Sequence, residues 1–332
     1  LARPRQFELV FNDITLDKSH VIVHPVRLSI CNADQRYYQG LRAENILRKK
    51  LPMALIHEAV GRVAFDPTGQ FEEGTLVVMI PNTPTEKDDI IAENYLRSSQ
   101  FRASGFDGFM QEYVSMKPDR LVVLPDDINL SVAAFTEIVS VSYHAIQRFL
   151  RFSHSRRNVI GVWGDGAMSF MMALTLSQLK PDCPVSVFGK HDDKLINFSF
   201  VERRINIADR TNSTNVDIAV ECVGGAGAQG AIAQAVDRLK PKGALLLMGV
   251  SETPPVVPTR LVLEKGLTLI GSSRSTRKDF ENAMSLIARP DVQNSLLKIV
   301  SLQRSFSTAS ELIDIFSEDS HSSYKSLLSK SL

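Results

Sequence analysis

Four side chains of types that bind transition metals stand in the first half of the chain. They are Cys31, the adjacent pair His57 and Glu58, and Glu137. Zinc accepts thiolate, imidazole and carboxylate ligands, and a catalytic zinc needs about three protein ligands with one position open. Each residue alone also has an ordinary explanation, since Cys31 follows apolar residues typical of a core and Glu137 could cap a helix or face water. Together the four indicate a metal site.

A glycine-rich loop follows a short apolar run in the second half of the chain. Its members are Gly164, Asp165, Gly166 and Ala167. Gly164 permits a tight turn, and Gly166 lets the backbone approach a pyrophosphate at the positive end of the next helix. Ser169 stands where a third glycine is usual and is small enough for close helix–strand packing. Apolar runs at 216–223 and 244–248, each closed by glycine, are typical of later strands in a parallel sheet. The pattern predicts a dinucleotide-binding Rossmann unit.

The end of the next strand predicts which dinucleotide binds. An acidic residue there would bind the ribose 2′-hydroxyl of NAD, but this chain has a glycine followed by bases. These residues are Gly189, Lys190, His191 and Lys194. They leave room and positive charge for the additional phosphate of NADP. The predicted cofactor is NADPH.

Composition limits the class of protein. A chain of 332 residues has room for about two domains, and its 38 basic residues balance 37 acidic ones. Neither nucleic acid nor a membrane surface is therefore an expected partner. No apolar run reaches a membrane-span length of about 20 residues, and three separated cysteines make no disulfide framework, which fits the cytoplasm. Because the chain opens at Leu1, we expect either a processed product or one module of a longer polypeptide.

The order of elements predicts an α/β protein with two domains. Strand-like runs at 21–23, 60–65, 74–80 and 121–125 indicate a β-rich domain, and a helix over 131–148 leads to the glycine loop. A further strand at 267–271 and an amphipathic helix at 278–288 follow. We expect residues 1–140, completed by 277–332, to form the β-rich domain and 141–276 the doubly wound parallel sheet. The serine-rich stretch from Ser317 is expected to be a solvated terminus.

These motifs resemble the zinc-dependent medium-chain dehydrogenase/reductase superfamily. The resemblance rests on 31–34, on 56–63 and on the glycine loop, in this order and spacing. It implies a GroES-like catalytic domain combined with a Rossmann domain. It also implies that Cys31 and His57 bind zinc, and that Glu58 and Glu137 are further ligands or alternates that exchange with water. Asp34 would orient a ligand histidine.

Two departures from the superfamily pattern affect the chemistry. Ala33 stands where many members carry a serine or threonine that begins the proton relay, so the proton must come through zinc-bound water, Glu58, or a tyrosine such as Tyr37 or Tyr38. The four-cysteine lobe that binds a structural zinc is also missing, because 81–110 contains no cysteine. At most one Zn²⁺ per chain is therefore expected.

Longer segments look like the ribulose-5-phosphate reductases. The matching stretches are 31–40, 51–58, 78–89 and 260–275. This resemblance implies NADPH-dependent reduction of D-ribulose 5-phosphate to D-ribitol 5-phosphate, the precursor of CDP-ribitol in teichoic acid and capsule synthesis. It also implies a homodimer, and fusion to or association with a ribitol-5-phosphate cytidylyltransferase.

A phosphorylated substrate requires a cationic anchor, and guanidinium groups form paired, charge-assisted hydrogen bonds with phosphate. Arg36 is the first candidate, with Arg42 and Arg274 as others, while Ser272 and Arg274 are also placed to face the cofactor. Three other functions remain open at this stage. They are a zinc polyol dehydrogenase acting on an unphosphorylated sugar alcohol, a zinc-free reductase of the quinone-reductase type, and a non-catalytic NADP-binding module of a fusion protein.

Overall fold

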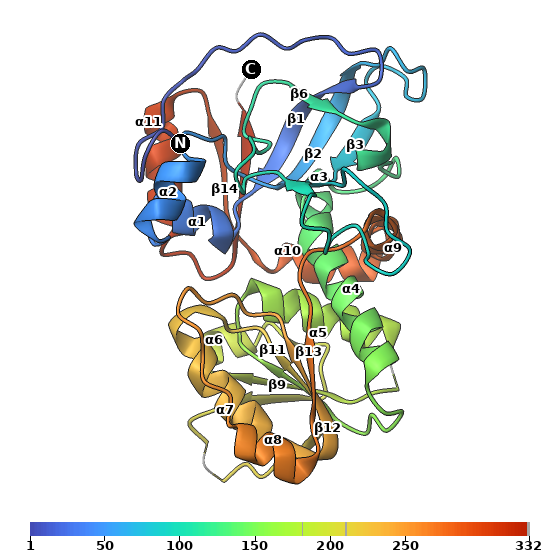
Figure 1. Cartoon of the computed structure of the whole chain (residues 1–332), viewed down its shortest axis with the longest axis vertical. Helices are drawn as coiled ribbons and strands as arrows, with labels where there is room; N and C mark the ends of the chain where they lie inside the picture. The colour runs from blue at the N-terminus through green and yellow to red at the C-terminus, as the bar shows by residue number, and fades with distance from the viewer. Residues whose placement is uncertain (181, 210, 331–332) are drawn as a thin grey trace. The chain divides into compact units, whose positions relative to one another are not determined.

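The computed structural model describes residues 1–180, 182–209 and 211–330. The chain forms two compact units: unit 1 consists of Leu1–Glu137 and Ser275–Leu332, and unit 2 of Ile138–Arg274 (Figure 1). Each unit has its own sheet, so the predicted α/β class with one β-rich domain and one parallel sheet is confirmed. Among the described residues, no helix combines the length and apolar character needed to cross a membrane.

The sheet of unit 1 has seven strands. In chain order they are β1 (Val21–Ser29), β2 (Glu58–Phe65), β3 (Leu76–Met79), β6 (Val114–Met116), β7 (Leu121–Val123), β14 (Val300–Phe306) and β15 (Lys325–Lys330). The spatial order is β14-β15-β1-β2-β3-β7, and β6 pairs with β1. All neighbours are antiparallel except β14 and β15. Two short strands, β4 (Asn82–Thr83) and β5 (Gln100–Phe101), pair separately.

The expectation that the serine-rich stretch from Ser317 is a solvated terminus is wrong. Strand β15 lies between β14 and β1, with Leu327 paired to Ser29. Ser326, Leu327 and Leu328 are fully buried. Serine is small enough to pack inside a sheet, so a serine-rich composition does not by itself indicate exposure to solvent. Strand β15 begins at Lys325 and places it beside Glu58.

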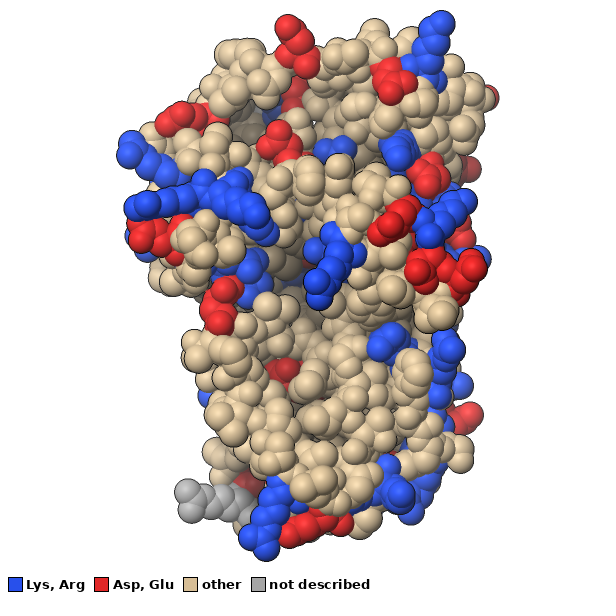
Figure 2. Space-filling model, viewed as in Figure 1, with Lys and Arg blue, Asp and Glu red and all other residues tan. Residues whose placement is uncertain are grey.

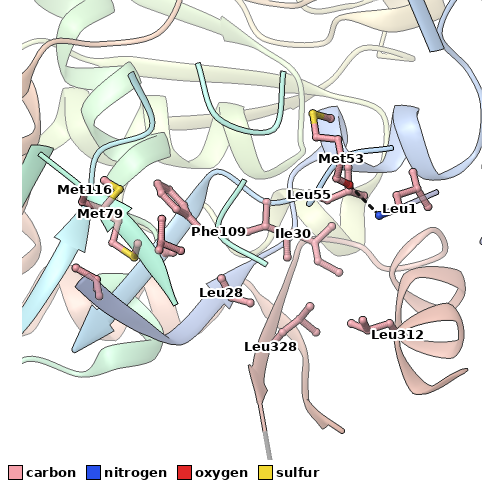
Figure 3. Packing of buried hydrophobic residues seen from close by; sticks show 14 of the residues in the cluster. Leu1, Leu28, Ile30, Met53, Leu55, Met79, Phe109, Met116, Leu312 and Leu328 are labelled. Carbon is pink, nitrogen blue, oxygen red and sulfur yellow. Dashed lines mark hydrogen bonds between the residues drawn. The ribbon is translucent and has the colours of Figure 1, made fainter. Parts of the chain in front are cut away.

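An apolar cluster holds unit 1 together (Figure 3). Leu28 of β1 and Leu328 of β15 meet Leu55 and Phe109, which come from segments between the strands. A fully buried side chain of this size stabilises the fold by roughly 1.5–3 kcal/mol. The cluster therefore fixes the start of β2, where His57 and Glu58 lie.

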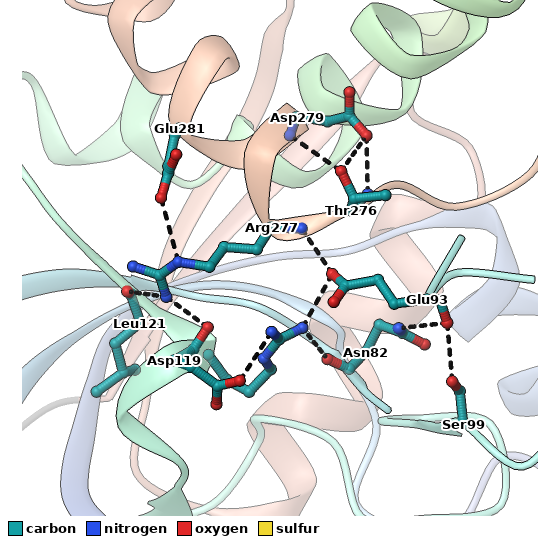
Figure 4. A network of polar contacts seen from close by, with 10 residues as sticks. Asn82, Glu93, Ser99, Asp119, Leu121, Thr276, Arg277, Asp279 and Glu281 are labelled. Carbon is teal, nitrogen blue, oxygen red and sulfur yellow. Dashed lines mark hydrogen bonds and ion pairs between the residues drawn. The ribbon is translucent and has the colours of Figure 1, made fainter. Parts of the chain in front are cut away.

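Polar contacts fasten the cysteine-free stretch between β4 and β5 (Figure 4). Arg120, 4% exposed, forms ion pairs of 3.0 Å with Glu93 and with Asp119. Glu93 also accepts a hydrogen bond of 2.7 Å from the backbone N–H of Arg277. Charge-assisted hydrogen bonds to a buried guanidinium are strong, so this network anchors the loop to the segments that carry Arg120 and Arg277.

The helices of unit 1 are mostly short. They are α1 (Asn32–Tyr38), α2 (Glu44–Lys50), η1 (Pro118–Arg120), α3 (Leu130–Ala133), α9 (Arg277–Ile287), α10 (Pro290–Leu297) and α11 (Ala309–Asp319), and α4 (Thr136–Phe152) begins in this unit. The single helix predicted over 131–148 is in fact α3 and α4. The break comes where the hydroxyl of Thr136 donates to the carbonyl of Ala133. Glu137 therefore lies in the first turn of α4, where a negative charge favours the helix dipole.

Unit 2 is a six-stranded parallel sheet in the order β10-β9-β8-β11-β12-β13. The strands are β8 (Ile160–Trp163), β9 (Val185–Gly189), β10 (Arg203–Asn206), β11 (Val216–Glu221), β12 (Leu239–Leu247) and β13 (Thr268–Gly271), and the helices are α5 (Ala167–Leu179), α6 (Asp192–Leu195), η2 (Gly225–Gly227), α7 (Ala228–Arg238) and α8 (Thr259–Lys265). Strand order reverses between β8 and β11, and ligands bind beyond the carboxyl ends of parallel strands at such a point. The glycine loop leaves β8 there.

Candidate metal and cofactor sites

Asp34 connects the two segments that carry the candidate metal ligands. One carboxylate oxygen accepts the backbone N–H of Cys31 at 3.0 Å, and the other accepts that of Ile56 at 2.9 Å. The second oxygen also lies 3.7 Å from Nδ1 of His57. Asp34 is fully buried, so its three contacts fix the start of α1 and the approach to β2 together. Asp34 therefore lies beside His57.

The residue before His57 has a strained backbone. Ile56 has a φ of 70°, a region that β-branched residues rarely adopt. Its N–H is held by Asp34, and its carbonyl accepts the N–H of Phe109 at 2.6 Å. Gly108 is packed so closely that a Cβ there would lie 2.4 Å from the Ile56 carbonyl oxygen. Such strain persists only where the surroundings hold it, and here it sets the direction of His57.

Cys31, His57 and Glu58 offer ligand atoms that all lie within 4.8 Å of one another. Thiolate, imidazole and carboxylate are the donors that zinc prefers, and three protein ligands leave a position open in a tetrahedral site. The residues present therefore fit a zinc ion. The geometry brings together three of the four predicted ligands.

Glu137, the fourth predicted ligand, lies outside this group of three but close enough to interact with it electrostatically. It is 8% exposed. Burial raises the pKa of Glu137 to about 7, although the charges of His57 and Lys325 lower it and that of Glu58 adds to the rise. Burial also lowers the pKa of His57, but the negative charges of Asp34 and Cys31 outweigh this and raise it well above its ordinary value. Acidic and basic groups are thus packed against one another around the three candidate ligands.

Lys325 is a member of the site that sequence reasoning missed. Its ammonium lies 2.8 Å from each carboxylate oxygen of Glu58 and donates to the carbonyl of Ile30 at 2.7 Å. Lys325 is 4% exposed at the side chain and Glu58 is fully buried. Burial lowers the pKa of Lys325, but the charges of Glu58 and Cys31 raise it above its ordinary value. Glu58 is therefore already paired with a cation.

The proposed phosphate anchors lie at and beyond the end of α1. Arg36 is half-buried in the last turn of that helix. The guanidinium of Arg42 lies over the ring of Tyr37, 4.7 Å from its centroid. The hydroxyl of Tyr38 donates to the carbonyl of Ile313, whereas the buried hydroxyl of Tyr37 has no hydrogen-bond partner among the described residues. Of the two tyrosines considered as proton donors, Tyr37 is therefore the one whose hydroxyl is uncommitted.

In unit 2 the glycine loop has the shape that a pyrophosphate needs. Gly164 has a φ of +125°, and a Cβ there would lie 2.2 Å from the hydroxyl oxygen of Ser169. Gly166 precedes the first residue of α5, Ala167, and a Cβ at Gly166 would meet no atom within 4 Å. The positive end of a 13-residue helix thus has open space in front of it, which fits a dinucleotide phosphate.

Asp165 binds the loop that was predicted to receive the NADP phosphate. One of its oxygens accepts the backbone N–H groups of Lys190 at 2.7 Å and His191 at 2.9 Å, and lies 2.9 Å from Nδ1 of His191. Burial raises the pKa of Asp165, but these hydrogen bonds lower it below its ordinary value. A Cβ at Gly189 would lie 2.8 Å from the Cβ of Asp165. The geometry therefore gives Asp165 the role of holding the basic loop.

The remaining predicted cofactor residues lie near the ends of strands. Lys194 is in α6, directly after the basic loop. Ser272, 9% exposed, follows β13 and donates its backbone N–H to Leu247. Arg274 has a left-handed backbone with a φ of 58° at the end of unit 2. All three belong to unit 2.

Comparison with protein families matches both parts of the chain. Residues 17–126 match the alcohol dehydrogenase GroES-like domain, and residues 190–289 match the zinc-binding dehydrogenase family. Ribulose-5-phosphate reductase 2 of Staphylococcus aureus is 52% identical over 325 residues, which is 98% of this chain and 95% of that protein. The ribulose-5-phosphate reductase of Bacillus spizizenii is 50% identical over the same share of each.

Solved structures agree with this. The crystal structure of S. aureus TarJ in complex with NADPH has a TM-score of 0.88 at 46% identity, covering 100% of this chain and 98% of that one. L-idonate 5-dehydrogenase from Escherichia coli has a TM-score of 0.86 at 19% identity, covering 99% of this chain and 96% of that one, and shares the fold.

Proposed function

The chain belongs to the ribulose-5-phosphate reductases, within the zinc-binding dehydrogenases, and from this premise we propose that it reduces D-ribulose 5-phosphate with NADPH. The product is D-ribitol 5-phosphate, which supplies CDP-ribitol for teichoic acid or capsule synthesis. The observation that carries the proposal is identity of 52% across nearly the whole chain. The grouping of Cys31, His57 and Glu58 supports it independently, because a chain without catalytic duty has no need of these three together.

Unit 1 would hold the zinc and the substrate, and unit 2 the NADPH. When bound, zinc would polarise the C2 ketone as a Lewis acid and NADPH would supply the hydride. Asp34 keeps the imidazole of His57 in one orientation, and Lys325 neutralises Glu58 beside it. Because Ala33 supplies no hydroxyl, the uncommitted hydroxyl of Tyr37 is the side-chain proton donor we favour.

The decisive experiment is a comparison of substrates. NADPH oxidation should be fast with D-ribulose 5-phosphate and feeble with D-ribulose, D-xylulose and D-fructose. NADH should serve less well than NADPH, because the strand end at Gly189 carries no acid. Equal rates on phosphorylated and unphosphorylated ketoses would favour a polyol dehydrogenase instead.

Phosphate recognition is assigned to Arg36. Removing one partner of a buried charge pair costs on the order of 3–5 kcal/mol, so Arg36→Ala should lower kcat/KM for D-ribulose 5-phosphate by roughly two to four powers of ten. Activity on unphosphorylated D-ribulose, however feeble, should hardly change. Arg48→Ala is the matched control, because Arg48 is exposed and pairs with Glu44 on the surface of α2. An equal loss on both substrates in Arg36→Ala would mean that Arg36 supports the fold.

The assembly proposed for the enzyme is a cytoplasmic homodimer that is fused to, or associated with, a ribitol-5-phosphate cytidylyltransferase. The product of one enzyme is the substrate of the other, which supports the association. Light scattering of the purified chain at several concentrations measures the first part, with twice the chain mass of 36.8 kDa expected. A mass of one chain at all concentrations would reject the dimer.

A further inference from the structure

Glu221 is a buried carboxylate at the carboxyl end of a strand in unit 2 that the proposed chemistry does not use. It is the last residue of β11, the central strand beside β8, and is 1% exposed. Among the described residues no cation pairs with Glu221; its carboxylate is satisfied by backbone N–H groups instead. A buried carboxylate is costly unless hydrogen bonds compensate it, so its partners indicate what it is there to hold.

Three backbone N–H groups from two turns converge on this carboxylate. Oε1 accepts the N–H groups of Val223 and Gly224, each at 2.8 Å, and Oε2 accepts that of Gly249 at 3.1 Å. The first two belong to the turn between β11 and α7, and Gly249 belongs to the turn after β12. Hydrogen bonds to a charged acceptor are about twice as strong as neutral ones. Glu221 therefore joins the two turns.

The two turns are also shaped to fit around Glu221. A Cβ at Gly249 would lie 2.5 Å from both carboxylate oxygens, and the N–H of Gly225 donates to the carbonyl of Val250 at 2.9 Å. Gly224 has a left-handed φ of +61°, and a Cβ there would lie 2.9 Å from that same carbonyl oxygen. Neither position has room for a side chain, so the two turns pack closely around this carboxylate and are also joined by the backbone bond between Gly225 and Val250.

The joined turns reach the glycine loop. The N–H of Cys222 donates to the carbonyl of Trp163, the last residue of β8, at 3.0 Å. A Cβ at Gly164 would lie 3.5 Å from the side chain of Val223. Gly164 is followed by Asp165 and Gly166, and open space lies beside Gly166 at the start of α5. Glu221 thus lies where strand order reverses, at the edge of a parallel sheet where ligands bind.

We propose that Glu221 is a positioning residue for NADPH, holding the turns after β11 and β12 in the conformation that the cofactor requires. This rests on the proposed function, in which unit 2 binds NADPH. Without the carboxylate, the turns would have to be ordered when the cofactor binds, and the cost would appear as weaker binding.

The test is Glu221→Gln, with NADPH binding measured by nicotinamide fluorescence and stability by thermal unfolding. A glutamine amide has only one acceptor oxygen, so the side chain can no longer accept from both turns; on the side of β12 the N–H of Gly249 would keep only its bond of 3.2 Å to the main-chain carbonyl of residue 221. We expect the Kd for NADPH to rise on the order of tenfold or more. The KM for NADPH should rise with it, while kcat at saturating NADPH changes little.

Asp217→Asn is the matched control. Asp217 lies at the opposite end of β11, is fully buried, and accepts two backbone N–H groups, those of Asn158 at 2.9 Å and Val159 at 3.2 Å. Those residues lie at the amino ends of the strands, away from the cofactor edge. Unlike Glu221, Asp217 also forms ion pairs with Arg156 at 3.0 Å and Lys240 at 3.3 Å. Asp217→Asn should lower Tm and leave the Kd for NADPH unchanged.

Three outcomes would count against the inference or against the proposed function on which it rests. If both variants lower Tm and neither weakens NADPH binding, Glu221 is a structural residue only and the inference is wrong. If Glu221→Gln does not fold, Glu221→Asp replaces it; the shorter carboxylate keeps the charge but does not span both turns, and an unchanged Kd would overturn the inference. If the unsubstituted chain does not bind NADPH, the proposed function itself fails.

Discussion

Lys325 shows how much of a site depends on a contact that no local pattern contains. Lys325 on β15 pairs with Glu58 on β2, 267 positions earlier in the chain. The motif around His57 predicts Glu58 as a candidate ligand, yet nothing near Glu58 in the sequence predicts a buried cation beside it. Asp34 was predictable because it lies three residues from Cys31 within one motif. Lys325 was not, because its serine-rich surroundings indicate solvent.

The Lys325–Glu58 pair gives a prediction at the residue scale. Lys325→Met leaves the buried Glu58 carboxylate without its cation, and breaking such a pair costs about 3–5 kcal/mol of unfolding free energy. Urea unfolding of the zinc-free protein measures the loss. Lys330→Met is the control on the same strand, because Lys330 and Glu112 are 38% and 63% exposed and lie 3.4 Å apart. That variant should change the free energy of unfolding by less than about 1 kcal/mol. Equal losses in both variants would contradict the assigned importance of the buried pair.

Secondary-structure elements differed in how well the sequence predicted them. The strands β8 and β11 and the second half of β12 were predictable because strands buried on both faces read as continuous apolar runs followed by glycine. Strand β13 was predicted from its apolar run although most of it is exposed. The helix predicted over 131–148 was found in the right place but divided, since apolar periodicity does not report a side-chain hydrogen bond such as that of Thr136. Strand β15 was missed because buried serines mimic a polar terminus.

The segment before β2 illustrates an element whose conformation depends on a distant glycine. Gly108→Ala would place a Cβ 2.3 Å from the Leu55 carbonyl oxygen and 2.4 Å from that of Ile56. The backbone ahead of His57 must then move. We expect Gly108→Ala to lose zinc on gel filtration and to melt at a lower temperature, with metal content read by elemental analysis.

A second glycine substitution serves as the control for this prediction. Gly230 lies in α7, and a Cβ there would meet no atom within 4 Å. Gly230→Ala should therefore keep its zinc and be neutral or more stable by up to about 1 kcal/mol. Full zinc content in Gly108→Ala would show that the segment tolerates the displacement and that Ile56 is not what directs His57.

At the scale of the whole molecule, each unit has a core of its own. The cluster around Leu28, Leu55 and Phe109 draws only on unit 1, and that around Trp163 and Ala219 only on unit 2. Domains with separate cores respond largely independently to substitutions that leave those cores intact. The two-domain organisation was predictable from the order of motifs along the chain. The return of the C-terminal residues to unit 1 was also expected, though not that they supply a strand inside its sheet.

Independence of the two units leads to a reciprocal prediction for the metal and the cofactor. Cys31→Ser replaces a thiolate ligand with a hydroxyl that binds zinc poorly, so the variant should lose both zinc and reductase activity. The unsubstituted enzyme should carry about one zinc per chain, since a three-ligand open site is the one group of ligands found among the described residues. The Kd of Cys31→Ser for NADPH should stay within about twofold, because the substitution leaves the core of unit 2 untouched. Glu221→Gln should show the reverse, with zinc retained and NADPH binding weakened.

Loss of NADPH binding in Cys31→Ser would mean that the metal site governs the cofactor site. Full activity in a zinc-free preparation would remove the metal from the mechanism.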